Sequence, residues 1–252
     1  MSDLKTIRAE EAATAPTLAA IVCGVDGSAE AALAAHQAAV LAPPGARLEL
    51  VGVIRVGLVE SVAAVMPARA NEPERHLRKE AWAALDSAAQ SLPAGFEVTT
   101  TLRTGPAAAL LESEAERLGA DLIAVGSHGQ GRLAGTLLGS VATRLVHEAA
   151  CSVLVARGGM NGEFPRTIVV GVDDTESSLR ALALGRELSR RTGAPLDPVH
   201  VRDGSPGAAL VERAAAEDLL VVGSRGVRGL RSFGSVSEGV AHRAAGSVLI
   251  VH

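Results

Sequence analysis

IVCGVDGS at residues 21–28 recurs as IVVGVDDT at residues 168–175. Each copy begins with a short, nearly continuous apolar run rich in Val and Ile, which is typical of a parallel strand covered on both faces. An acidic residue follows the run in both copies, and Ser28 then stands where a helix N-cap belongs. The pattern therefore predicts a buried strand, a turn and a helix at two places in the chain.

Three further blocks of the first copy recur, in the same order, in the second. They are DLIAVGSHG (121–129 and, with changes, 218–226), GSV (139–141 and 234–236) and SVLV (152–155 and, as SVLI, 247–250). Ordered repeats of this kind indicate a duplicated domain. The second copy is shorter between its first two blocks by about one helix and one strand. We assign the loss to the counterparts of residues 72–92, which have the apolar period of an amphipathic helix, and 96–102, which alternate like an edge strand.

The expected fold class is α/β, with two tandem doubly wound parallel-sheet domains, the second of them truncated. Residues 17–157 are predicted to form a full domain of five strands alternating with four helices, and residues 166–252 a shortened, degenerate one. A glycine-rich stretch ending in proline, 158–165, is expected to be the linker. Residues 1–16 are a polar N-terminal tail without the apolar core of a signal peptide.

Composition narrows the classes of partner. The formal net charge is −4 and aromatic residues make up only 2% of the chain, so neither a basic surface nor base-stacking platforms for nucleic acid are expected. No apolar run is long enough to cross a bilayer, which predicts no membrane partner. The two cysteines, Cys23 and Cys151, form no disulfide framework and no metal-ligand spacing. A soluble cytoplasmic protein is the resulting expectation.

The ends of two predicted strands carry the residues suited to chemistry. Asp26 follows the first strand, and Gly126 and Gly129 follow the penultimate strand of the first copy. Glycines there let backbone N–H groups approach an anion, and Gly139-Ser140 opens a helix whose free N–H groups favour phosphate. A nucleotide phosphate held by backbone is one interpretation. The alternative is that the glycines only make tight turns and that Asp26 is a favourable charge at a helix start.

The spacing G-x2-G-x9-G-S, after a strand ending Val-Asp-Gly-Ser, resembles the universal stress protein (UspA) family in its tandem two-domain form. The resemblance implies an adenine nucleotide alpha hydrolase-like fold in which the glycine loop and the following Ser hold ATP. Mg²⁺ is left open as an accompanying ion. The cofactor-binding residues implied are Val25, Asp26, Gly126, Gly129, Gly139, Ser140 and Val141, with an adenine-side contact near Leu48 on the second strand.

The chain also departs from the family pattern. Ala142 stands where ATP-binding relatives often carry Ser or Thr, which removes one phosphate donor. In the second copy only seven residues separate Gly226 from Gly234, so its phosphate loop should fall out of register with its helix. Three arginines there, at 225, 228 and 231, remain able to attract an anion. The first copy is therefore the expected ATP site.

The leading interpretation is an ATP-binding regulatory protein of the stress response, acting through a nucleotide-dependent change of shape or partner. A nucleotide-free interaction or scaffold module and a slow ATPase are the alternatives. The sequence favours a non-enzyme, because it has no Gly-x4-Gly-Lys-Ser/Thr loop and because neither of its lysines, Lys5 and Lys79, lies in the phosphate motif. No catalytic residue and no metal ligand is assigned.

The resemblance also implies an assembly. Relatives commonly pair their last strands edge to edge, and here residues 151–155 and 247–250 are expected to pair within one chain as an internal pseudo-dimer. The strand at 196–201 would be left as a sheet edge, where a homodimer is a further possibility.

Trp82 falls in the apolar stripe of its predicted helix and is expected in the core.

Overall fold

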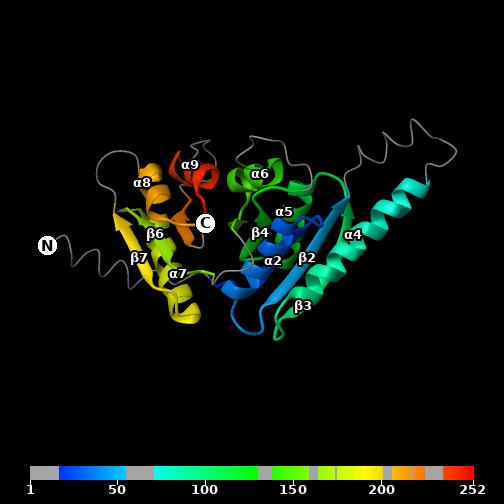
Figure 1. Cartoon of the computed structure of the whole chain (residues 1–252), viewed down its shortest axis with the longest axis horizontal. Helices are drawn as coiled ribbons and strands as arrows, with labels where there is room; N and C mark the ends of the chain where they lie inside the picture. Colours follow the sequence, from blue (N-terminus) through cyan, green and yellow to red (C-terminus); the bar gives the residue numbers. More distant parts are fainter. Residues whose placement is uncertain are drawn as a thin grey trace.

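A nine-stranded sheet with helices on both faces forms the body of the protein, as the computed structural model in Figure 1 shows. The structure describes residues 17–54, 71–129, 138–158, 164–173, 175–200, 206–216, 218–224 and 235–252.

The two halves of the chain build the sheet in turn. The first half contains β1 (Ala20–Val25), α2 (Ala29–Leu41), β2 (Arg47–Ile54), α4 (Asn71–Ser91), β3 (Glu97–Thr104), α5 (Ala107–Leu118), β4 (Leu122–Gly126), α6 (Ser140–Glu148) and β5 (Ser152–Ala156). The second contains β6 (Ile168–Val172), α7 (Glu176–Thr192), β7 (Leu196–His200), α8 (Pro206–Arg213), β8 (Leu219–Gly223), α9 (Ser235–Arg243) and β9 (Ser247–Val251). Within the described residues, the second half has no counterpart of α4 and β3, which confirms where the truncation was predicted.

The strand order β3-β2-β1-β4-β5-β9-β8-β6-β7 gives the sheet an approximate two-fold symmetry about its centre. Strands are parallel within each half, whereas β5 and β9 pair antiparallel, with Leu154 opposite Leu249. The predicted pairing of the two last strands within one chain is therefore confirmed. It turns two sheets into one and leaves only β3 and β7 as edges.

Apolar residues cover both faces of the sheet because parallel strands need burial on each side. Helices α2, α4 and α7 pack on one face around residues such as Ile21 and Leu50. Helices α5, α6, α8 and α9 pack on the other face around Val22 and Ile123. All four of these strand side chains are at most 1% exposed, as the continuous apolar runs of the sequence predicted.

Polar contacts also join the halves on the α2 side. The buried Ser247 hydroxyl of β9 donates to the Gln37 side-chain oxygen of α2 at 2.7 Å, and the Gln37 amide donates to the Arg157 carbonyl at 3.2 Å. Burial lowers the pKa of Arg157 to about 10. The Arg191 guanidinium of α7 donates to the carbonyl of Leu41 at the end of α2. These contacts satisfy buried polar groups only when the two halves are joined.

Pro198 lies in the middle of the edge strand β7 and is exposed. Proline lacks the N–H that an incoming strand would use, so it is confined to sheet edges and discourages further pairing there. Beside it, the Asp197 carboxylate accepts from Arg213 at 2.6 Å, which places a charged pair at the same edge. The strand predicted as a possible homodimer edge is therefore poorly suited to pairing.

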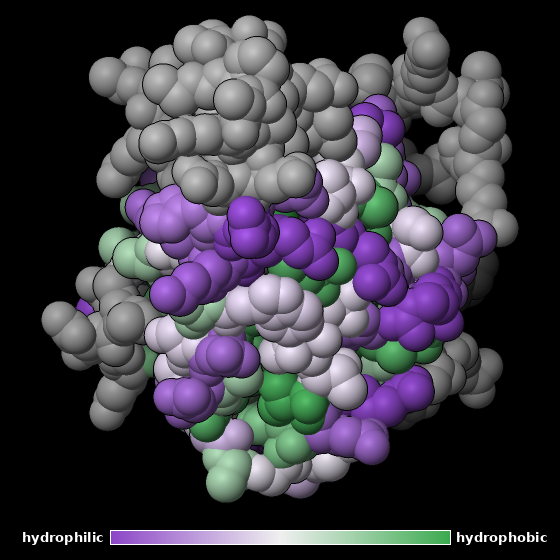
Figure 2. Space-filling model, turned by 90° about the vertical axis from the view of Figure 1, so that its right-hand side faces the viewer, coloured by the Kyte–Doolittle hydropathy of each residue, from purple (hydrophilic) through white to green (hydrophobic). Residues whose placement is uncertain are grey.

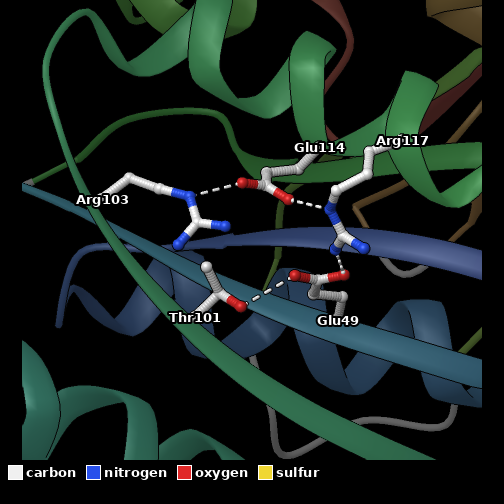
Figure 3. Close-up of polar contacts among 5 residues, drawn as sticks. All are labelled: Glu49, Thr101, Arg103, Glu114 and Arg117. Carbon is white, nitrogen blue, oxygen red and sulfur yellow. Dashed lines mark hydrogen bonds and ion pairs between the residues drawn. The ribbon is translucent and has the colours of Figure 1, made fainter.

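A charged network fixes α5 to the strands at the opposite end of the sheet (Figure 3). Glu49 on β2 accepts from the Arg117 guanidinium and, at 2.8 Å, from the Thr101 hydroxyl. Glu114 on α5 accepts from Arg103 at 2.5 Å and from Arg117 at 2.6 Å. Both carboxylates are at most 5% exposed, and each has two donors, as buried charges require.

Two opposing effects set the pKa of Glu114. Burial raises it, but hydrogen bonds and positive charge from Arg117 and Arg103 together lower the pKa below its ordinary value. A carboxylate whose pKa is lower in the folded than in the unfolded protein stabilises the fold above the unfolded value. That stabilisation is lost as the pH falls through the folded value.

We predict that Glu114→Gln lowers the free energy of unfolding at neutral pH by about 1–3 kcal/mol, because two guanidinium groups lose their charged partner. The deficit should begin to shrink as the pH falls below about 4.5, the ordinary pKa of the unfolded carboxyl, and should vanish once the pH has fallen through the lower folded pKa and the wild-type carboxylate is protonated. Urea unfolding across pH measures it, with the exposed Glu116→Gln on the same helix as control. A deficit that does not change with pH would contradict the charged role of Glu114.

Candidate functional site

The carboxyl ends of β1 and β4 lie side by side at the point where the strand order reverses. Strand β1 pairs with β2 on one side and with β4 on the other, and the connections leave the sheet in opposite directions from here. Open α/β sheets bind ligands at such a switch point. Val25, at the end of β1, is 6% exposed, and Gly126 ends β4.

A tight turn after β1 presents Asp26 to solvent. Its Oδ1 accepts hydrogen bonds from the Ser28 backbone N–H at 3.0 Å and from the Ser28 hydroxyl at 2.6 Å. Ser28 in turn caps α2, accepting from the Ala31 N–H at 3.1 Å. Gly27 between them has a φ of 84°, a conformation that glycine adopts without strain. The predicted N-cap is confirmed, and it also fixes the carboxylate.

Two glycines allow this turn to approach the end of β4. A Cβ on Gly126 would lie 2.7 Å from the backbone carbonyl carbon of Glu30 in the first turn of α2. A Cβ on Gly129 would lie 2.2 Å from Oδ2 of Asp26. The carboxylate of Asp26 therefore lies directly against the Gly129 backbone, and any larger residue at 129 would displace it.

Gly139, the third glycine, joins the loop after β4 to α6. The Gly139 N–H donates to the Ser127 carbonyl at 2.7 Å, and a Cβ at position 139 would lie 3.2 Å from the same oxygen. Gly139 is the N-cap of α6 and offers no side chain to its first amides. Ser140 is exposed and Val141 is partly buried in that first turn. Such an uncapped helix start is suited to an anion.

Seven of the eight predicted residues thus lie at the ends of β1 and β4 or at the start of α6, but Leu48 does not. Leu48 is in register with Ile21, at the amino end of β2, and is fully buried. Gly52 is the residue of β2 opposite Val25. The prediction of Leu48 as a contact is corrected, because parallel strands bring residues together by register rather than by order along the chain.

Two residues of this site went unpredicted, Glu30 and Ser127. Both act through backbone atoms, Glu30 against Gly126 and Ser127 toward Gly139. A backbone role leaves no residue-type signal in a sequence. The Ser127 hydroxyl also lies 3.1 Å from Nδ1 of His128, the next residue of the loop.

The second half repeats the same turn with additional hydroxyl groups. Asp173 accepts from the backbone N–H and hydroxyl of Thr175, as Asp26 does from Ser28. Ser178 adds a hydroxyl that donates to the Asp173 carbonyl at 2.5 Å and has no counterpart at Ala31. A Cβ on Gly223 would lie 2.5 Å from backbone atoms of Ser177, which repeats the close approach at Gly126.

An open hollow lies beside this second turn. Asp173 and the hydroxyls of Thr175, Ser177, Ser178 and Ser237 form part of its lining, and valines and Leu210 form an apolar wall. The sequence did not predict it, since the second copy was expected to be degenerate. The shortened 226–234 connection and the three nearby arginines lie outside the described residues.

Comparison with known proteins places the chain in a family. The sequence profile of the universal stress protein family matches residues 18–157 and 199–252. The chain belongs to the universal stress protein family. A universal stress protein of Mycobacterium tuberculosis is 34% identical over 148 residues, which are 56% of this chain and 49% of that protein. One from Mycobacterium bovis is 28% identical over 182 residues, 52% of this chain and 61% of that protein. The chain therefore spans about half the length of the first of these curated relatives.

The solved structures agree on the fold of this universal stress protein. That of a universal stress protein from Archaeoglobus fulgidus superposes with a TM-score of 0.69 at 19% identity, covering 94% of this chain and 97% of the other. A likeness at this identity concerns the fold, and it extends over both halves. The tandem architecture predicted from the internal repeats is therefore confirmed.

Neither cysteine belongs to the site. Burial raises the pKa of Cys23 to about 12 and that of Cys151 to about 11, so at neutral pH both stay protonated and weakly reactive. In the described part of the chain, no group of three His, Cys, Asp or Glu residues is placed to hold a metal ion. No helix in those residues is long and apolar enough to span a membrane.

We predict that Gly126→Ala and Gly223→Ala each lower the free energy of unfolding by about 1–3 kcal/mol, because the added methyl group meets backbone atoms that cannot rotate away. Gly52→Ala is the matched control, since its methyl group would meet only the ends of Leu85 and Leu102 at 3.1 Å. Chemical denaturation measures all three. Equal losses for Gly52 and Gly126 would contradict the close approach of α2 to β4.

Proposed function

We propose that the first half binds ATP between the Asp26 turn and the start of α6, and that this binding regulates the protein in the stress response. One observation supports it most: Gly126, Gly129 and Gly139 let the Asp26 turn, the loop after β4 and the start of α6 approach one another, since a Cβ at each would meet Glu30, Asp26 or Ser127. A surface built from backbone amides at a switch point fits a polyphosphate.

The chemistry of each group fits a part of the ligand. The first-turn amides of α6, after Gly139, are suited to phosphate oxygens, and Ser140 adds an exposed hydroxyl. The Asp26 carboxylate is suited to accept from the hydroxyls of a ribose. Mg²⁺, where it accompanies ATP, would be held mainly by the phosphates, with the Asp26 carboxylate on the protein side.

ATP would regulate the protein by binding one of its conformations more tightly than the others. ATP in this site contacts two segments, the turn at 26–28 and the start of α6 at 139–141, and stabilises conformations in which they face each other. At a ligand concentration about a hundred times the Kd, such binding stabilises that state by about 2.7 kcal/mol. The surface near the site would then differ between the free and the bound protein, and a partner can recognise this difference.

We place this function in the cytoplasm, where Cys23 and Cys151 stay reduced.

We predict that the purified protein retains adenine nucleotide and binds ATP without releasing phosphate. Asp26→Asn should weaken ATP binding about tenfold, because it removes a charge-assisted hydrogen bond but keeps the oxygen that Ser28 uses. Gly129→Val should abolish binding. Calorimetry measures the affinity, and a phosphate assay measures turnover.

Asp173→Asn is the matched control, because Asp173 makes the same turn in the second half. It should change ATP affinity by less than about twofold. Loss of binding on Asp173→Asn alone would move the site to the second-half hollow, and phosphate release at a steady rate would favour an ATPase. No binding at millimolar ATP would favour a nucleotide-free scaffold.

A further inference from the structure

The outer face of α4 carries the protein's one tryptophan. Trp82 is 40% exposed and is the one large hydrophobic side chain exposed within the described part of the chain. The core prediction for Trp82 was wrong because the buried stripe of α4 runs through Leu85 and Ala88, and Trp82 lies at the edge of this stripe, about 60° around the helix from Leu85. Tryptophan is among the residues most enriched at the energetic centres of interfaces.

Opposite charges flank Trp82 along α4, with the exposed Lys79 beside Arg78 on the amino-terminal side. Arg78 lies one turn before it and Asp86 one turn after it, on the same face, and both are exposed. Neither Arg78 nor Asp86 forms an ion pair with any part of the chain that the structure describes, whereas His76 and Glu80 on the same helix do pair, at 3.0 Å. The two charges are too far apart along the helix, at about 12 Å, to satisfy each other.

We propose that two copies of the chain associate through α4, with the helices antiparallel and a two-fold axis passing beside Trp82. An isologous interface requires a patch that is complementary to itself. Rotation about this axis sets Arg78 opposite Asp86 of the partner subunit, and Asp86 opposite the partner's Arg78. The two tryptophans meet at the axis.

The position of α4 in the fold favours this end of the molecule. Helix α4 lies at the end of the sheet formed by β2 and β3, away from the second half (Figure 1). Of the residues coloured on the face seen there, hydrophobic ones are interleaved with hydrophilic ones (Figure 2). The other end of the sheet is closed to strand pairing by Pro198 and the Asp197–Arg213 pair. A contact between single helices buries an area at the low end for specific interfaces, so we expect a Kd of roughly micromolar size.

Charge reversal on the intact protein tests the geometry. Arg78→Asp alone and Asp86→Arg alone each create two like-charge contacts across the axis and should weaken dimerisation about tenfold, measured by sedimentation. The double variant R78D/D86R restores both pairs with reversed sign and should return the Kd to within about threefold of the wild type. Glu116→Arg, an exposed charge reversal on α5, is the control and should have no effect.

The single tryptophan provides an independent readout at the axis. Trp82 emission should shift to shorter wavelength as the concentration rises from about 0.1 to 100 µM, and R78D should displace that shift to higher concentration. Trp82→Gln should leave the protein folded and monomeric. A wild type that stays monomeric to about 100 µM would overturn the proposal. A dimer that the single charge reversals leave unchanged, or that the double variant does not restore, would overturn it as well.

Discussion

The close approach of the first turn of α2 to the end of β4 determines the arrangement of the site. Only a glycine at position 126 leaves room for the backbone of Glu30, and this contact sets the turn after β1 against the loop after β4. Asp26 then lies on Gly129, and the loop continues through Ser127 to the start of α6. Because backbone atoms make the contact, it survives large changes of side chain, and Gly223 repeats it against Ser177.

The two halves of the chain repeat the same unit but end the sheet differently, which makes the molecule asymmetric. Joining the halves through β5 and β9 satisfies the two central edges and leaves the two outer ends to be completed differently. In the first half, α4 and β3 extend the sheet, and the charged network of Glu49 and Glu114 fixes α5 across it. The described residues of the second half include no counterpart of these elements, and an exposed proline protects the edge there. The half whose described residues lack counterparts of α4 and β3 thus carries a proline on its exposed edge strand.

Much of the fold was predictable because repeats and apolar periods report directly on strands and helices. The truncation and the helix start at Ser140 follow from such patterns, whereas the pairing of the last strands was implied by the resemblance to the family. Leu48 and Trp82 were mispredicted for geometric reasons: the first depends on strand register, and the second on which side of a helix faces the sheet. The Glu114 network and the second-half hollow join residues far apart in sequence, and no local pattern marks them.

The most direct test of the central claim is an amide NMR titration of the full chain with ATP. We predict that the signals of residues 26–28, 126–129 and 139–141 shift together with one affinity, since these segments form one backbone-lined surface. The signals of 171–178 and 223 should remain in place. Shifts confined to that second group, or no shifts at either strand end, would contradict a nucleotide site built on the approach of α2 to β4.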